Sequence, residues 1–215
     1  MKMYLSLILV MHVLVASAQE GNQAVVQSHY LLSQFTPGKV HMKSGQANPL
    51  KLNYNGITNE MVFEYNGTYL AIANPEQVDS VVIDGRVFMP VEKKFYEMLT
   101  HTPHALYREF SCSIKEPELS NGYGAAAPTA AANDLRGIYK RDMAYQPNLP
   151  ADIKIVAKQT WWIKTNDGFR KFTNEQQLRK LFPDKKDKIS EWVKNNDTNF
   201  SKPDDLADLV KQIDQ

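Results

Sequence analysis

The sequence predicts an α+β fold, in which a mainly antiparallel β meander is followed by a β-hairpin and short C-terminal helices. Turn dipeptides such as Asn66-Gly67 and Asp84-Gly85 separate short runs rich in Val, Ile, Phe and Tyr, which is typical of successive hairpins. No helix of about ten residues or more fits between residues 38 and 114, so a parallel βαβ arrangement is not expected. Helix periodicity and helix caps begin only after residue 172.

Residues 1–18 have the three parts of a secretory signal peptide. Lys2 is followed by an apolar run over residues 4–16 and then by the small residues around Ala18. The run is shorter than the roughly 20 residues that a membrane span needs. We therefore expect export to the periplasm or the outside, cleavage after Ala18, and no membrane span in the mature chain.

The charge of the chain is nearly balanced, with 25 Lys and Arg against 24 Asp and Glu. Loss of Lys2 with the signal peptide would leave no net charge. A neutral chain lacks the overall electrostatic footprint of a nucleic-acid-binding protein, so no nucleic-acid partner is expected. Cys112 is the one cysteine of the sequence, which excludes an internal disulfide. It lies in an apolar run, and a buried, unreactive thiol is expected there.

Residues 19–114 are expected to hold the β-rich meander. "KVHMK" and "PLKLNY" flank Ser44-Gly45, "MVFEY" and "TYLAIA" flank Asn66-Gly67, and "VVI" and "RVFMPV" flank Asp84-Gly85. "FYEMLT" and "ALYREFSCSI" continue the series. Exposed strand edges favour aggregation, so we expect the sheet to close into a barrel or to stack as a sandwich.

Residues 115–150 are expected to form a long flexible loop, because they are rich in Ala, Gly and Pro and show no sustained period. Gly122, Gly124 and Ala127 match the spacing of a dinucleotide-binding loop. Polar residues precede them and Pro128 follows, so the strand and helix that such a loop requires are missing and no cofactor is predicted. The loop's candidates for ligand contact are Tyr123, Tyr139 and Tyr145.

Residues 151–215 are expected to form a β-hairpin and a helical part packed on the same domain. The hairpin strands flank Asn166-Asp167-Gly168. A capping box beginning at Thr173 opens the first helix, and Pro183 ends it. A second helix follows in 184–195, and a third begins near Ser201 and Pro203. These helices are short and amphipathic, so their apolar faces must pack against the sheet.

The segments "NEMVFEYNGTYLAIANPEQVDSVVIDGRVFMPV", "NGYG", "TWWIKTNDGFRKF" and "LRKLFPDKKDKISEWVKNN" resemble a family of exported proteins from Bacteroidetes-type bacteria. The resemblance covers most of the mature chain. It implies that the β-rich part and the helical end belong together. No established activity or catalytic residue comes with the family, so the resemblance implies no functional site.

Glu97, His101, His104 and Glu109 form an HxxH pair with flanking carboxylates and are the candidate metal ligands. Pro103 lies between the histidines and favours a turn, so the ligand-bearing helix of a metalloprotease is not expected. The alternative is a polar hairpin end with solvated imidazoles.

Trp161 and Trp162 should point to opposite faces of their strand, because strand side chains alternate. Trp161 shares its face with apolar residues and is expected in the core. Trp162 shares its face mostly with lysines. We expect a C-terminal helix to cover it. The alternative is an exposed aromatic platform for a sugar ring or a partner protein.

Three functions stay open on the sequence. The first is an exported, non-catalytic binding or interaction protein of the bacterial cell envelope, with an unknown envelope protein or glycan as partner. The second is a secreted hydrolase or metalloenzyme that uses His101, His104 and nearby carboxylates. The third is a structural accessory of an envelope assembly, which would expose a large apolar patch.

Overall fold

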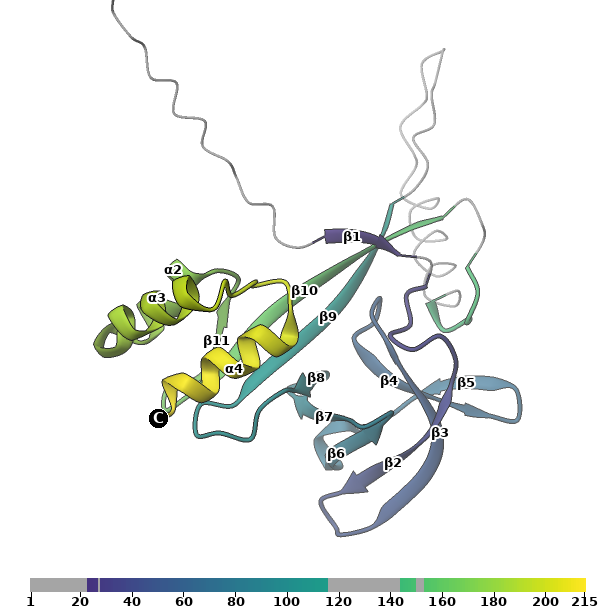
Figure 1. Cartoon of the computed structure of the whole chain (residues 1–215). Helices are drawn as coiled ribbons and strands as arrows, with labels where there is room; N and C mark the ends of the chain where they lie inside the picture. Colours follow the sequence, from purple (N-terminus) through teal and green to yellow (C-terminus); the bar gives the residue numbers. More distant parts are fainter. Residues whose placement is uncertain (1–22, 27, 116–143, 150–152) are drawn as a thin grey trace, which may run out of the picture.

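The computed structural model of the chain (Figure 1) describes residues 23–26, 28–115, 144–149 and 153–215. Within these residues, ten antiparallel strands pair in the order β1-β10-β9-β8-β7-β6-β2-β3-β4-β5, and β11 pairs with β10. The strands are β1 (Gln23–Val26), β2 (Thr36–Met42), β3 (Ala47–Asn55), β4 (Glu60–Tyr65), β5 (Thr68–Ala71), β6 (Val78–Ile83), β7 (Arg86–Val91), β8 (Lys94–Met98), β9 (Leu106–Lys115), β10 (Lys154–Thr165) and β11 (Gly168–Phe172). The predicted α+β class is confirmed. Residues 1–18, the predicted signal peptide, lie outside the described residues.

The hairpins fall where the turn dipeptides place them. Asn66 and Gly67 have φ angles of 49° and 76°, and Asp84 and Gly85 have 51° and 71°. Positive φ at both central residues is the geometry of a type I′ turn, which the right-handed twist of paired strands favours. These turns join β4 to β5 and β6 to β7.

The sheet departs from a simple meander at β2. This strand pairs with β3 on one side and with β6 on the other, so β3, β4 and β5 form an excursion between them. The strands form one sheet that does not close. The expectation of a closed barrel or a sandwich of two sheets is therefore wrong. In the described part of the chain, β5 is left as an edge, and helices cover one face of the sheet at its other end (Figure 1).

The long pairing of β9 with β10 joins the first and last parts of the chain in one sheet. β10 is paired on both sides, because β1 and β11 follow one another along its second edge. β1 is not among the strands predicted from the sequence. β9 extends to Lys115, and residues 144–149 are also described, so residues 116–143 and 150 of the predicted loop lie outside the described residues.

Three α-helices follow the sheet in the described residues: α2 (Glu175–Leu181), α3 (Lys186–Asn195) and α4 (Pro203–Ile213), with a short 3₁₀ turn η2 (Pro183–Lys185) after α2. The cap of α2 is Asn174, one residue later than expected, and its side chain accepts from the Gln177 amide at 2.9 Å. Lys202, not Ser201, is the cap of α4, without a side-chain hydrogen bond. None of the helices of the described residues is long and apolar enough to cross a membrane.

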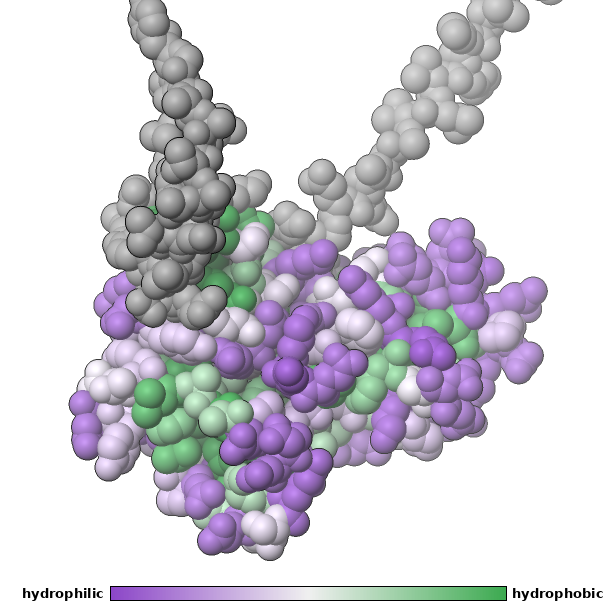
Figure 2. All heavy atoms as spheres, turned by 180° about the vertical axis from the view of Figure 1, so that it is seen from behind, coloured by the Kyte–Doolittle hydropathy of each residue, from purple (hydrophilic) through white to green (hydrophobic). Residues whose placement is uncertain are grey.

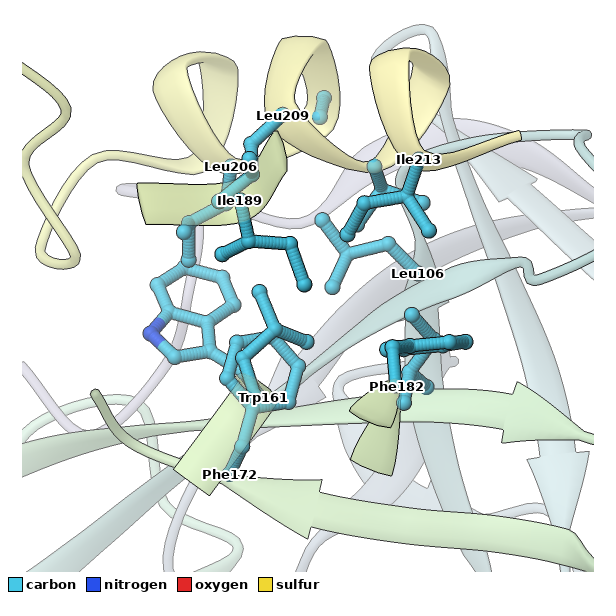
Figure 3. Packing of buried hydrophobic residues seen from close by; sticks show 12 residues of the cluster. Leu106, Trp161, Phe172, Phe182, Ile189, Leu206, Leu209 and Ile213 are labelled. Carbon is cyan, nitrogen blue, oxygen red and sulfur yellow. The ribbon is translucent and has the colours of Figure 1, made fainter. Parts of the chain in front are cut away.

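The helices pack on one face of β9, β10 and β11 and enclose a core (Figure 3). Its largest members are Trp161, Phe172 and Leu106 from the sheet, and Leu206, Leu209 and Ile213 from α4 point down onto them. A second core lies between the bent strands β2 to β8, around Tyr54, Phe88 and Phe95. The predicted packing of amphipathic helices on the sheet is confirmed.

Candidate functional site

Trp162 lies on the face of the sheet that the helices do not cover. Trp161 belongs to the helix-covered core, whereas Trp162 packs with residues of β7, β8 and β11. The alternation of side chains along β10 was therefore predicted correctly. The expectation that a C-terminal helix covers Trp162 is wrong, because all three helices lie on the side of Trp161.

An aromatic surface surrounds Trp162, and we call it the aromatic face. The Trp162 and Tyr96 rings stack with centroids 5.5 Å apart and planes at 22°, and the Tyr107 and Phe169 rings meet edge to face at 5.0 Å. β9 lies between β8 and β10 in the sheet, and its Tyr107 is directly opposite Trp162 on one side and Met98 on the other. The other members of the aromatic face are Met89, Val91, Met98 and Ala105. Within the described part of the chain, every hydrophobic neighbour of this cluster comes from strands or strand connections.

A hydrogen bond to Glu109, which is itself bound by Lys94, holds the Trp162 indole in one orientation. Its Nε1 donates to Glu109 Oε2 at 2.9 Å, and Lys94 Nζ donates to Glu109 Oε1 at 2.9 Å. Both carboxylate oxygens are thus used, and the carboxylate of the buried Glu109 is neutralised. Burial, assisted by the negative charges of Glu109 and Glu92, raises the pKa of Tyr96 to about 12. The stacked pair is therefore neutral at physiological pH.

Figure 2 shows the molecule from behind, on the side opposite to the view of Figure 1. Hydrophilic side chains stand among pale and weakly hydrophobic ones over the middle of the molecule, and a greener patch lies over the part of the sheet around β3 to β5. Tyr65 and Leu70, in β4 and β5, are the large hydrophobic residues that the described part of the chain exposes most, at 61% and 42%.

The predicted metal ligands are not gathered into one site. Glu97 is bound to Arg108, on the strand face that also carries Leu106, whereas Glu109 lies on the opposite face with Trp162. His101 is exposed. The described residues contain no group of three or more His, Cys, Asp or Glu side chains that could hold a metal ion.

His104 is hydrogen-bonded to Asp214, a partner that was not predicted from the sequence. Its Nδ1 contacts Asp214 Oδ1, and its backbone amide donates to Asp214 Oδ2 at 3.1 Å. Although burial acts to raise it, hydrogen bonds from His104 and Thr102 hold the pKa of Asp214 below its usual value. Lys185 Nζ also donates to the carbonyl of Ile213. The His104 contacts fix the end of α4 against the β8–β9 connection, and the Lys185 contact ties it to η2.

A buried charge pair joins β8 and β9 on the helix-side face. Arg108 Nε donates to Glu97 Oε2 at 2.8 Å and its Nη2 bonds to the same oxygen, while Arg86 Nε lies 3.8 Å from Oε1. Glu97 and Arg108 are both less than one-tenth exposed. Glu97 and Arg108 are directly opposite each other in the antiparallel pairing of β8 with β9, so their side chains can meet. The sequence offered no signal for that register.

Tyr145 is the one loop tyrosine among the described residues, and its hydroxyl donates to Glu60 Oε2 at 2.6 Å. Next to it, the Ala144 carbonyl lies 2.8 Å from Nε2 of the buried His29 and accepts from Asn55 Nδ2 at 2.5 Å. Residues 144–149 are therefore packed on the sheet rather than part of a free loop. Tyr123 and Tyr139 lie outside the described residues.

Cys112 is unsuited to nucleophilic chemistry. Burial raises the pKa of its thiol to about 12, so the reactive thiolate is scarce at neutral pH. Its Sγ contacts the His29 carbonyl at 3.9 Å. Cys112 is half-buried and not fully buried as expected, and the raised pKa favours an unreactive thiol.

Comparison with known proteins gives no relative for this chain: no family model, no curated protein and no solved structure matches it. The aromatic face must therefore be interpreted from its own geometry and chemistry.

Proposed function

We propose that the chain is an exported, non-catalytic binding protein of the bacterial cell envelope, and that the aromatic face is its binding surface. The observation that carries the proposal is the stack of Trp162 on Tyr96, on the side of the sheet away from the helices. Aromatic side chains supply large contact area with little conformational entropy to lose, and Trp and Tyr are accordingly enriched where proteins bind partners.

The rigidity of Trp162 supports a binding role. The indole is fixed by Glu109, which is fixed in turn by Lys94. A side chain already held in its bound orientation loses less entropy when a ligand arrives, so this arrangement favours affinity.

The engagement of the candidate catalytic groups also favours binding over catalysis. Glu97 is engaged by Arg108, Glu109 by Lys94 and Trp162, and His104 by Asp214. A general acid or base must reach a substrate proton. Glu97, Glu109 and His104 instead each bind another side chain of the protein.

The export part of the proposal rests on the sequence of residues 1–18. Its test is the intact mass of protein recovered from the periplasm or medium after expression of the whole precursor. The expected mass is that of a chain beginning at Gln19. Recovery of material that still contains residues 4–16 would contradict export.

The binding part is tested with the mature protein on an array of envelope glycans and in pull-downs from envelope extracts. We expect Trp162→Ala to abolish capture of the ligand while the far-ultraviolet circular dichroism stays that of the parent. Leu70→Ser is the matched control, because Leu70 is exposed and apolar but lies on β5, away from the aromatic face. Equal loss in both variants, or loss in neither, would refute binding through Trp162.

A further inference from the structure

The neutral overall charge of the chain conceals a local excess of positive charge around Trp162. The described strand positions on the side of the sheet that carries the aromatic face include five lysines: Lys94, Lys154, Lys158, Lys164 and Lys171. The same positions carry one carboxylate in the described residues, Glu109, which is already bound to Lys94. Glu92 and Lys93 are exposed in the adjoining turn between β7 and β8 and add no net charge.

The register fixes the lysines on this side of the sheet. Lys171 is directly opposite Trp162, and Lys164 is directly opposite Phe169, which belongs to the aromatic cluster. Paired residues of antiparallel strands point to the same face. Lys158 and Lys164 share the face of Trp162 because they lie at even spacing from it along β10.

The lysines lie on both sides of the indole along one strand. With a rise of about 3.3 Å per residue, Lys164 follows Trp162 by about 7 Å and Lys158 precedes it by about 13 Å. Lys164 and Lys171 are exposed. The face therefore presents an aromatic ring flanked by cations in a line, which suits an extended polymer that carries acidic groups.

We propose that this surface binds an acidic polysaccharide, with one sugar ring stacked on Trp162 and neighbouring acidic groups paired with Lys158, Lys164 and Lys171. The proposal rests on the proposed function and names the ligand class of the same face. The apolar C–H side of a sugar ring packs on the face of an aromatic ring, and Trp162 is presented as a flat stacked ring. Complementary charge then adds affinity and attracts the polyanion from a distance.

A peptide fits this place less well. Peptides commonly bind a sheet by adding a strand to a free edge. Both edges of β10 are already paired, with β9 on one side and with β1 and β11 on the other. Contact with Trp162 must therefore be made by the face of a ligand and not by main-chain pairing.

The test uses the mature full chain and two soluble polymers, alginate, whose residues are uronic acids, and neutral dextran. We expect alginate to bind and dextran not to bind, measured by calorimetric titration. Binding should weaken as salt is raised, because the Debye length falls from about 10 Å at 0.1 M to about 3 Å at 1 M.

Two paired variants localise the binding. The double variant Lys164→Glu/Lys171→Glu changes exposed lysines of the aromatic face and should weaken alginate binding at least about tenfold. The double variant Lys186→Glu/Lys194→Glu makes the same charge change on α3, which packs on the other side of the sheet. It should leave alginate binding unchanged. Trp162→Ala should also weaken it.

Four outcomes overturn the inference. Equal binding of alginate and dextran, lost only in Trp162→Ala, rejects the acidic ligand and leaves the proposed binding surface standing. Equal weakening in both double variants means that only net charge matters. Tighter binding of oligo(dT) than of alginate assigns the face to single-stranded nucleic acid. Absence of alginate binding rejects the ligand class, and the comparison of Trp162→Ala with Leu70→Ser then decides the proposed function separately.

Discussion

Trp161 and Trp162 follow one another in β10 and lie on opposite faces of the sheet, with different partners. Trp161 is 2% exposed under the helices, and its indole Nε1 donates to the carbonyl of Phe200 at 2.8 Å. Trp162 is partly exposed, stacks on Tyr96 and donates to Glu109. The first therefore holds the C-terminal segment to the sheet, whereas the second lies in the surface to which we assign binding.

The two tryptophans should differ in their contribution to stability. Trp161→Ala should lower the free energy of unfolding by about 3–5 kcal/mol, because it empties a closed core. Trp162→Ala should lower the free energy of unfolding by about 1–2 kcal/mol, because it removes one aromatic pair and one hydrogen bond to a carboxylate at a partly exposed site. Urea denaturation of the two variants measures both values. Losses of equal size would mean that Trp162 is covered in solution.

Local turn chemistry was enough to predict most hairpins. Asn66-Gly67 and Asp84-Gly85 determine their turns by the backbone angles they tolerate, independently of the rest of the chain. The pairing of β2 with β6 and of β1 with β10 could not be predicted in this way. Such pairings join distant segments, and nothing in the local sequence encodes the partner.

Only the part of the candidate site that depends on local sequence could be predicted, because contacts between distant segments are not encoded locally. Alternation along β10 placed Trp161 and Trp162 on opposite faces, but which face the helices cover depends on where α4 crosses the sheet. The separation of Glu97 from Glu109 depends on the register of β8 against β9, and the pairing of His104 with Asp214 depends on the position of the end of α4. These are tertiary relations between residues far apart in the sequence.

Glu97→Gln should destabilise the protein strongly. The change removes the negative charge that compensates the buried Arg108, and breaking a buried ion pair on one side costs about 3–5 kcal/mol. Glu64→Gln is the control, because Glu64 lies 3.7 Å from Lys51 in a largely exposed pair and should cost less than about 1 kcal/mol. Chemical denaturation measures the difference. Similar values for both variants would show that Arg108 reaches solvent.

Asp214→Asn tests the attachment of α4 through its pH dependence. Burial favours a higher pKa for Asp214, but the hydrogen bonds from His104 and Thr102 prevail and hold the folded-state pKa below the usual 3.8. A carboxyl with a lowered pKa adds stability above its unfolded-state value, and this stability is lost as the pH falls through the folded-state pKa.

The variant should therefore be less stable than the parent by about 1 kcal/mol at neutral pH, since the pair lies near the surface. The difference should shrink below the usual pKa of 3.8. Thermal melts across the acid range measure it. Asp208→Asn, in an exposed pair with Lys211, should show no such pH dependence. A constant difference between Asp214→Asn and the parent at every pH would contradict the role of the charge.

Gly38→Ala should open the junction between β2 and β6. Gly38 is paired with Leu50 of β3 and with Ile83 of β6. An added Cβ would lie 2.3 Å from Ile83 Cγ2 and 2.6 Å from the Val82 carbonyl oxygen. The side chain of Ile83 can rotate away, but the carbonyl oxygen is part of the β6 backbone, so the strands themselves must separate. Overpacking of this kind costs about 1–3 kcal/mol.

The effect should be local, because this junction is the connection between the β3–β5 excursion and the rest of the sheet. Hydrogen exchange should accelerate at the amides of β2 and β6 in Gly38→Ala and stay slow in β9 and β10. Gly45→Ala is the control: its φ of 89° strains any other residue, but an added Cβ meets nothing within 4 Å. That variant should lose about 1 kcal/mol, the cost of a positive φ for a residue with a Cβ, without faster exchange in β6. Equal exchange in β6 for both variants would show that β2 and β6 have room for the methyl group, and that the sheet is less closely packed at its central junction than the distances to Ile83 and Val82 imply.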